Sequence, residues 1–130
     1  MTDGSLGCGG VFVTIASLNL EALVSFYGAL LGQEAQVYQR DRYAEFRFPG
    51  LRLAIFRPRP DQVARFAGAS SGAMSLCLEV ASLEAAIAHL TRLGCPPPGA
   101  ILTASHGREV YAFDPDGNRL ILHQNVEKPA

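Results

Sequence analysis

The sequence predicts an α+β fold in which two tandem βαβββ modules form a single domain. Two amphipathic helical stretches are each preceded by one strand-like run and followed by three such runs. The two halves are also similar in sequence: Leu-Glu-Ala at residues 20–22 recurs 63 positions later at residues 83–85, and GLRLAIF from Gly50 aligns without a gap with GNRLILH from Gly117. Two copies of one unit explain both matches most simply.

The first module covers about residues 11–57 and begins with a strand in the alternating run VFVTI. A helix follows in LNLEALVSFYGALLG, where apolar residues recur at three- and four-residue steps between Asn19, the predicted N-cap, and Gly32, the predicted C-cap. Three strands are predicted next, in EAQVYQR, YAEFRF and LRLAIF, with a hairpin turn at Pro49-Gly50 between the last two.

A linker of about residues 58–72 separates the modules, because two prolines and a run of small residues interrupt the pattern there. It contains one short predicted helix around residues 62–66. The second module, about residues 73–125, repeats the order with a strand in SLCLEV and a helix from Ser82 to Gly94. Its three remaining strands are predicted in AILTA, EVYAF and RLILHQ.

Composition limits the kinds of partner. The chain has 130 residues, 48% of them hydrophobic, which is enough for one domain with a substantial core. A net charge of -1, without long charged runs, favours a small-molecule partner over nucleic acid or a membrane surface. Three widely spaced cysteines predict neither a disulfide framework nor a zinc site and are typical of the reducing cytoplasm. The segment MTDGSLGCGG lacks the features of a signal peptide, and no later apolar run is long enough to span a bilayer.

The stretch DPDG at residues 114–117 is predicted to be a hairpin turn. Pro115 fixes φ at the first turn position, Asp114 can accept hydrogen bonds from the backbone, and Gly117 allows a positive φ. A calcium loop is disfavoured, because glycine falls at its fourth position instead of the sixth and Asn125 stands where such a loop has a glutamate.

The tandem βαβββ order, with LEALVSFYGALLG in the first helix and GREVYAFDPDGNRLIL near the end, resembles the vicinal oxygen chelate superfamily. This superfamily includes glyoxalase I, extradiol dioxygenases, fosfomycin-resistance enzymes and bleomycin-resistance proteins. The resemblance extends from about Val11 to Gln124 and implies that the two modules curve into an incomplete barrel around a cleft. Since members commonly dimerise, it also implies a homodimer.

The same resemblance locates the metal ligands of the superfamily's metalloenzymes. They correspond here to Phe12 and Ala54 in the first module and to Ser75 and Ile121 in the second. None of these side chains is a good ligand for a divalent transition metal, and a shift of one residue in either direction supplies none. We therefore expect no metal and no cofactor. Metal binding through His89, His106 or His123 is the disfavoured alternative, because His89 lies on a predicted helix and no two of the three histidines have the local spacing of metal ligands.

Strand alternation places Leu53, Ile55, Leu120 and Leu122 on the faces that the helices cover. The opposite faces would line the cleft and combine aromatic and aliphatic walls with a few polar groups, as small-molecule pockets do. By parity the cleft residues are Phe12, Thr14, Arg52, Ala54, Phe56, Ser75, Cys77, Glu79, Arg119, Ile121 and His123.

The polar members of this set have alternative interpretations. Arg52 and Arg119 occupy equivalent positions, and we favour side chains that reach solvent over side chains that point into the cleft. A non-catalytic role is favoured for His123, because no acid or nucleophile lies at a fixed sequence spacing from it, and Glu79 is expected to face water or pair with an arginine. If the protein is an enzyme, His123 would act in acid–base catalysis with Glu79 or Arg52. Cys77 is interpreted as a small core residue.

The placement of two further groups stays open. His106 and Arg108 could form a rim or lid beside the cleft. On the strand YAEFRF, either the set Tyr43, Glu45 and Arg47 or the set Phe46 and Phe48 could face inward.

These patterns favour metal-independent binding of a small apolar or aromatic molecule in the cleft, similar to the bleomycin-resistance proteins and without catalysis. The alternative is an enzyme of the glyoxalase or dioxygenase kind, a lyase, isomerase or dioxygenase, with an atypical or absent metal site. The fold alone does not decide between them.

Overall fold

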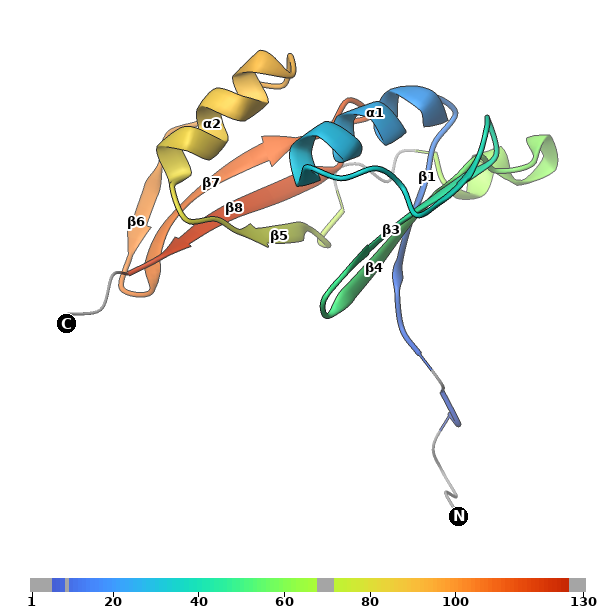
Figure 1. Ribbon diagram of the computed structural model, residues 1–130, viewed down its shortest axis with the longest axis horizontal. Helices are drawn as coiled ribbons and strands as arrows, with labels where there is room; N and C mark the ends of the chain where they lie inside the picture. The colour runs from blue at the N-terminus through green and yellow to red at the C-terminus, as the bar shows by residue number, and fades with distance from the viewer. Residues whose placement is uncertain (1–5, 9, 68–71, 127–130) are drawn as a thin grey trace.

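Two four-stranded sheets, each covered on one face by a helix, make up the protein in its computed structural model (Figure 1). The structure describes residues 6–8, 10–67 and 72–126. Residues 68–71 of the predicted linker, and much of the N-terminal segment considered for targeting, lie outside the described residues. Among the residues that are described, no helix is both long and apolar enough to cross a membrane.

Module one has the predicted βαβββ order. Its strand order is β1-β4-β3-β2, with β1 parallel to β4 and the other neighbours antiparallel. Gly50, at φ 85°, closes the hairpin between β3 and β4, as predicted. The elements are β1 (Val13–Ala16), α1 (Leu20–Leu31), β2 (Val37–Gln39), β3 (Tyr43–Phe48) and β4 (Leu51–Phe56).

Module two repeats this topology, which confirms the predicted duplication. Its strand order is β5-β8-β7-β6, and β5 runs parallel to β8 as β1 does to β4. A 3-10 helix, η1 (Pro60–Arg65), lies in the linker close to the predicted short helix. The remaining elements are β5 (Leu76–Glu79), α2 (Leu83–Arg92), β6 (Leu102–Ala104), β7 (Gly107–Phe113) and β8 (Arg119–Asn125).

The helix ends show how local sequence sets the element bounds. Ser82 caps α2 by accepting a hydrogen bond from the backbone N–H of Ala85 at 3.1 Å, and Gly32 ends α1 in the left-handed conformation. Asn19 occupies the predicted N-cap position of α1, but its side chain makes no cap hydrogen bond. Instead, the Ser17 hydroxyl oxygen accepts a bond from the Asn19 backbone N–H at 2.9 Å.

The core lies between the helices and the sheets. Leu53, Ile55, Leu120 and Leu122 are at most 1% exposed, so their predicted position beneath the helices is confirmed. One continuous apolar cluster joins the two modules, because buried side chains of α1 and α2 belong to it together with those of both sheets. In Figure 1 both helices lie on the upper side, while the sheets diverge below them and do not close into a barrel.

The DPDG stretch is the hairpin turn that the sequence predicts, and it also forms hydrogen bonds with side chains of module one. The Asp114 Oδ1 atom accepts backbone N–H groups of Asp116 and Asn118, both at 2.9 Å. Its Oδ2 atom accepts the buried Tyr27 hydroxyl of α1 at 2.7 Å. Burial and the adjacent Asp114 charge raise the pKa of Tyr27, so this hydroxyl stays protonated as a donor. The Ser17 hydroxyl donates to Asp116 at 2.6 Å.

Candidate functional site

The face of the first sheet that no helix covers, its helix-free face, carries the residues that the sequence assigns to the cleft. Thr14 pairs with Ala54, and Ala54 pairs with Glu45, so these side chains leave the same face. Tyr43 and Arg47 flank Glu45 on β3 and therefore face the same way. This result decides the open question about β3, because Phe46 packs in the core instead.

The helix-free face of the second sheet follows the same register. Ile121 of β8 pairs with Cys77 of β5 and with Tyr111 of β7. Cys77 is exposed, so its interpretation as a small core residue is wrong; nothing in the described chain covers this part of the sheet. Partial burial and the charges of Glu79 and Glu109 raise the pKa of the Cys77 thiol, which disfavours a reactive thiolate.

The superfamily's metal positions do not form a ligand set in this fold. Ala54 and Ile121 occupy the middle of their helix-free faces with side chains that cannot coordinate an ion. The carboxylate beside Ala54 is that of Glu45, which is already engaged: Tyr43 donates its hydroxyl at 2.8 Å and Arg47 forms an ion pair. These two donors hold the pKa of Glu45 below its ordinary value. The residues present therefore do not fit that metal.

Arg52 and Arg119 do not extend freely into solvent, contrary to the favoured interpretation. The Arg52 guanidinium lies 4.0 Å from the centroid of the Phe12 ring, and its Nε atom is buried. The Arg119 Nε atom donates to the Ser75 hydroxyl at 2.7 Å. Each arginine thus reaches from the last strand of its module to the residue that directly precedes the parallel strand, where it contacts a ring or a hydroxyl.

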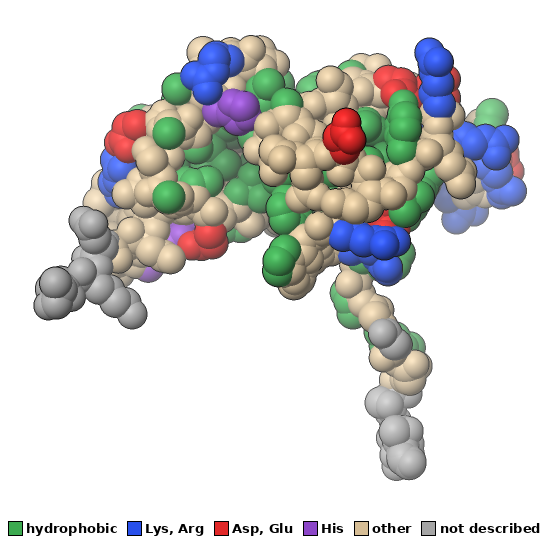
Figure 2. All heavy atoms as spheres, viewed as in Figure 1, with side chains coloured by type: hydrophobic (Ala, Val, Ile, Leu, Met, Phe, Trp, Pro, Cys, Tyr) green, Lys and Arg blue, Asp and Glu red, His purple; other side chains and the backbone are tan. Residues whose placement is uncertain are grey.

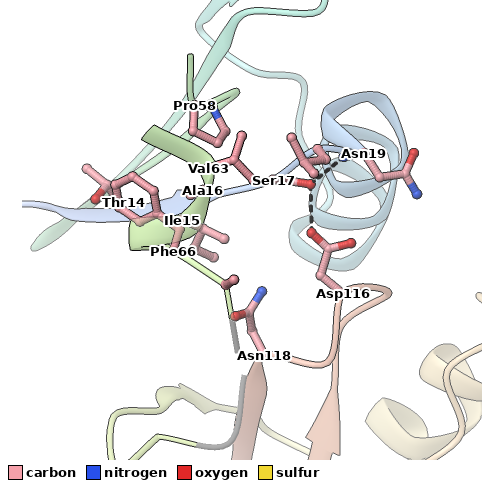
Figure 3. Close-up of a pocket in the computed structure, with 12 residues that line it drawn as sticks. Thr14, Ile15, Ala16, Ser17, Asn19, Pro58, Val63, Phe66, Asp116 and Asn118 are labelled. Carbon is pink, nitrogen blue, oxygen red and sulfur yellow. Dashed lines mark hydrogen bonds between the residues drawn. The ribbon is translucent and has the colours of Figure 1, made fainter. Parts of the chain in front are cut away.

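A pocket of about 430 Å³ opens between the modules, beside the end of β1 (Figure 3). Thr14 and Ala16 come from the helix-free face of β1, and Asp116 and Asn118 come from the turn before β8. Its apolar wall is formed by the linker residues Pro58, Val63 and Phe66, labelled in Figure 3. Of the predicted cleft residues, Thr14 is the one that lines this pocket.

The linker wall is anchored on the sheet. The Phe66 ring packs edge-to-face on Phe56 of β4, with ring centroids 5.3 Å apart. Phe66 itself is 42% exposed at the side of the pocket. The role of these linker residues is not predicted from the sequence; the signal that could have indicated it is the pair of apolar residues Val63 and Phe66 within an otherwise polar and small-residue stretch.

His123 lies beside Glu79, one of the two partners that the enzyme alternative gave it. Its Nδ1 atom lies 2.8 Å from Glu79 Oε1, and its Nε2 atom lies 3.0 Å from His106 Nδ1. Glu109 pairs with His123 across β7 and β8 and completes a group of side chains on this helix-free face. Glu109 is not among the residues predicted for the cleft; its even spacing from Tyr111 and Phe113 on β7 is the signal that could have placed it on this face.

His106 and Arg108 separate in the structure. His106 joins the group at the edge of the helix-free face, whereas Arg108 points to the other side of the sheet. There the Arg108 guanidinium forms a two-pronged ion pair with Glu84 of α2, at 2.7 and 3.0 Å, and also donates to Gln124. Arg108 therefore attaches the helix and does not form a lid.

Comparison with known domain families gives one assignment over most of the chain. The family described as “Glyoxalase-like domain” matches residues 12–123. No curated protein matches the chain.

Solved structures of similar fold agree with this assignment. A glyoxalase-related enzyme from Fulvimarina pelagi is 25% identical, with a TM-score of 0.68 over 91% of this chain and 89% of that one. A glyoxalase/bleomycin resistance protein from Catenulispora acidiphila is 24% identical, with a TM-score of 0.64 over 89% and 97% of the two chains.

A third similar structure contains a ligand and a metal. It is a mutant fosfomycin resistance protein from Listeria monocytogenes, complexed with Mn(II) and 1S,2S-dihydroxypropylphosphonic acid. That protein is 15% identical, with a TM-score of 0.69 over 92% of each chain. At this identity the similarity establishes the fold and nothing further.

Proposed function

Since the chain belongs to the glyoxalase-like domain family, we propose that it binds a small molecule with an apolar or aromatic body in the pocket between its modules. Binding does not use a metal at the positions that the superfamily resemblance indicates. The observation that carries this proposal is the pocket itself: an apolar wall of Pro58, Val63 and Phe66 faces the polar groups of Thr14 and Asn118.

The lining indicates the chemistry of the ligand. An aromatic or aliphatic body would pack on Val63 and Phe66, where burial of apolar surface supplies the affinity. The Asn118 amide nitrogen donates to Asp114 at 2.8 Å, which fixes the amide and leaves its oxygen to accept from a ligand N–H or O–H. Asp116 is the charged residue of the lining, so a neutral or cationic ligand is favoured over an anion.

Metal independence is supported by the side chains at the four ligand positions of the superfamily. Phe12, Ala54 and Ile121 have no donor atom, and the Ser75 hydroxyl already accepts a hydrogen bond from Arg119. A first-row metal ion would find no pair of ligands among them.

The test is a titration of the full chain, in buffer containing EDTA, with a panel of one- and two-ring aromatic compounds that carry a hydroxyl or amine group. Calorimetry should detect saturable binding of at least one member. In the variant Val63→Phe the larger ring would occupy the pocket, so we expect at least a tenfold weaker affinity. Phe66→Ala, which removes part of the wall, should weaken binding about three- to tenfold.

The matched control is Leu102→Ala on β6, because Leu102 is similarly exposed, at 48%, but lies outside the pocket. Its affinity should equal that of the unaltered chain. Absence of binding across the panel, or equal weakening by Leu102→Ala, would contradict the proposal.

The proposal includes two further expectations, one about the oligomeric state and one about the cellular compartment. A homodimer is supported by the large apolar side chains exposed on or beside the helix-free faces, including Phe12, Met74 and Tyr111. Light scattering with size-exclusion chromatography measures the stoichiometry, and a monomer at micromolar concentration would contradict the dimer. The free thiols of the three cysteines support the cytoplasm as the compartment.

A second candidate function is catalysis by His123, favoured by its 2.8 Å contact with Glu79. A carboxylate that orients an imidazole is a common arrangement in general acid–base catalysis. Recovery of every panel compound, whether or not it binds in the pocket, after long incubation with the chain separates the two functions: unchanged compounds support binding alone. Conversion that is lost in His123→Gln and retained in His89→Gln would support an enzyme.

A further inference from the structure

Four side chains with metal-binding chemistry converge at the end of the second sheet that lies away from the DPDG turn. Glu109 of β7 and Glu79 of β5 are the direct cross-strand partners of His123 on β8. Partners in register leave the same face, so the three side chains form a row across three strands. His106 reaches the row from the turn between β6 and β7. In Figure 2 histidine and acidic side chains gather at the lower edge of this module.

Gly107 keeps the turn close enough for His106 to reach this row. Its φ is 145°, and a Cβ atom added there would lie 2.2 Å from the Gln124 carbonyl oxygen. The backbone of the hairpin therefore approaches β8 more closely than any side chain would allow. The Val126 backbone N–H also donates to the His106 carbonyl at 3.3 Å. The backbone conformation of the hairpin therefore holds His106 in this position.

The distances in this group fit a small cation. His106 Nδ1 and His123 Nε2 are 3.0 Å apart, and one ligand atom from each of His106, Glu109 and His123 lies within 4.8 Å of the others. Two nitrogens bound to one tetrahedral zinc ion at about 2.0–2.1 Å are separated by about 3.3 Å. A shift of a few tenths of an ångström would therefore convert the contact between the two rings into a pair of ligands.

Glu79 lies where a carboxylate that orients a metal-binding histidine would lie. Its Oε1 atom lies 2.8 Å from His123 Nδ1, so in the tautomer with a proton on Nδ1 the carboxylate accepts that N–H and the Nε2 lone pair is left on the side of His106. A carboxylate in this role fixes the tautomer and orientation of the ring and strengthens it as a ligand. His123 is only 8% exposed, so its ring is held by packing as well.

We propose that His106, Glu109 and His123 form a binding site for a divalent transition metal ion such as Zn²⁺, with Glu79 orienting His123. Two imidazoles and one carboxylate suit zinc and neighbouring first-row metals, and three protein ligands leave a coordination position for water or a small ligand. The exposed His106 gives the ion access from solvent.

This site is distinct from the superfamily's metal position and from the pocket. His123 lies two residues beyond Ile121 on β8, which displaces it by about 7 Å along the strand. It lies five residues, or about 17 Å along the strand, from Asn118 of the pocket. The inference therefore goes beyond the proposed function, and either one can fail without the other.

The test is a titration of the EDTA-treated and dialysed full chain with Zn²⁺ by calorimetry and with Co²⁺ by visible absorption. We expect one ion per chain and the intense absorption of cobalt with fewer than six ligands. His106→Gln and Glu109→Gln should each weaken Zn²⁺ binding at least tenfold, and Glu79→Gln should weaken it about 10- to 100-fold through the orientation of His123. Because His106 is exposed, His106→Gln should retain the far-UV circular dichroism of the unaltered chain.

His89→Gln is the matched control, since His89 is the remaining histidine of the chain and lies on α2. Its affinity for Zn²⁺ should not change. Equal binding by His106→Gln and the unaltered chain, or no binding at millimolar Zn²⁺, would refute the site and leave a hydrogen-bonded pair of imidazoles. A thiolate-to-cobalt absorption band would also refute it, by assigning the ion to a cysteine.

Discussion

The two modules share one backbone plan but use the same position for different chemistry. At the end of the parallel strand pair, module one has Ala16 beside Phe56, and module two has Glu79 beside His123. In module one this end is apolar: Phe66 of the linker packs on Phe56, and Ala16 lines the pocket. In module two no described residue covers the equivalent end, which holds the histidine and glutamate side chains proposed as a metal site.

This difference shows which part of the repeat is free to vary. The strand pairings and the buried leucines are equivalent in both modules, because the buried apolar residues of both helix-covered faces contribute to one core. The helix-free faces carry no such constraint, and they differ at nearly every position. Duplication of the module therefore preserves the scaffold while each helix-free face can acquire its own binding function.

The largest effect on the free energy of unfolding should come from substitutions at the equivalent core positions Leu53 and Leu120, which are both at most 1% exposed. Leu53→Ala and Leu120→Ala should each lower the free energy of unfolding by about 3 kcal/mol, through lost burial and a residual cavity. Because both leucines belong to one cluster, chemical denaturation should show a single transition in each variant. Two separated transitions would mean that the modules unfold independently.

Gly107, which has this role in module two alone, should give the next largest effect on the free energy of unfolding. Gly107→Ala places a Cβ atom 2.2 Å from the Gln124 carbonyl oxygen, so the hairpin must move away from β8. We expect a loss of about 2 kcal/mol in the free energy of unfolding, measured by urea denaturation, and weaker Zn²⁺ binding because His106 is displaced. Gly99→Ala is the control, since no atom lies within 4 Å of the added Cβ atom. An equal effect of both changes would remove the special role of Gly107.

Removal of the hydrogen bond between the modules should have an intermediate effect on the free energy of unfolding. Tyr27→Phe removes the buried hydroxyl that donates to Asp114, and it should cost about 1 kcal/mol of unfolding free energy, measured by thermal or chemical denaturation. Tyr38→Phe is the control on the same module, because the Tyr38 hydroxyl donates to Glu21 on the exposed surface. A larger loss for Tyr38→Phe than for Tyr27→Phe would contradict the role of Tyr27 in joining the modules.

The smallest effect concerns Glu21 and Glu84, which occupy equivalent positions at the start of α1 and α2. Arg108 holds the pKa of Glu84 at about 2, below its ordinary value of 4.5. Since the folded-state pKa is the lower one, this contact stabilises the protein above pH 4.5, and its contribution is lost as the pH falls towards 2. Glu84→Gln should therefore reduce the loss of stability over that pH range, measured by denaturation at a series of pH values.

Salt distinguishes the two glutamates. The ion pair of Glu84 with Arg108 is exposed, so added salt should reduce the effect of Glu84→Gln near neutral pH. Glu21 instead accepts hydrogen bonds from the Tyr38 hydroxyl and the Asp41 backbone N–H. The effect of Glu21→Gln should respond less to salt, and an equal response would mean that the two contacts are of the same kind.

Most of the fold could be predicted because its signals are local. The period of the apolar residues, Ser82 and Gly32 at helix ends, and the DPDG turn each act within a few residues, and the repeat confirms them by occurring twice. The same locality applies at Asn19: the sequence correctly marks the position of the N-cap, although the Asn19 side chain makes no cap hydrogen bond and its backbone N–H donates to the Ser17 hydroxyl. Local sequence signals determine where a helix or strand begins, but they do not determine which atoms form hydrogen bonds at that end.

The candidate sites could be predicted only in part. Alternation along each strand places Thr14, Ala54, Ile121 and His123 on the helix-free faces, because parity depends on the strand alone. The group around His123 also requires that β5, β7 and β8 be neighbours and in one register. Glu79 and His123 are 44 residues apart in the sequence, and their contact at 2.8 Å exists only once the parallel pair has formed.

The sequence by itself determined the two βαβββ modules and the buried faces, since these depend on residue identity, period and turn chemistry. Together with the superfamily resemblance, it also determined that the metal positions implied by that resemblance carry no ligands. Only the tertiary structure decided that Phe66 forms the wall of a pocket and that Cys77 is exposed. It alone also brought His106 to His123. The physical reason is that strand pairing and linker packing bring together residues whose spacing along the chain carries no signal of their contact.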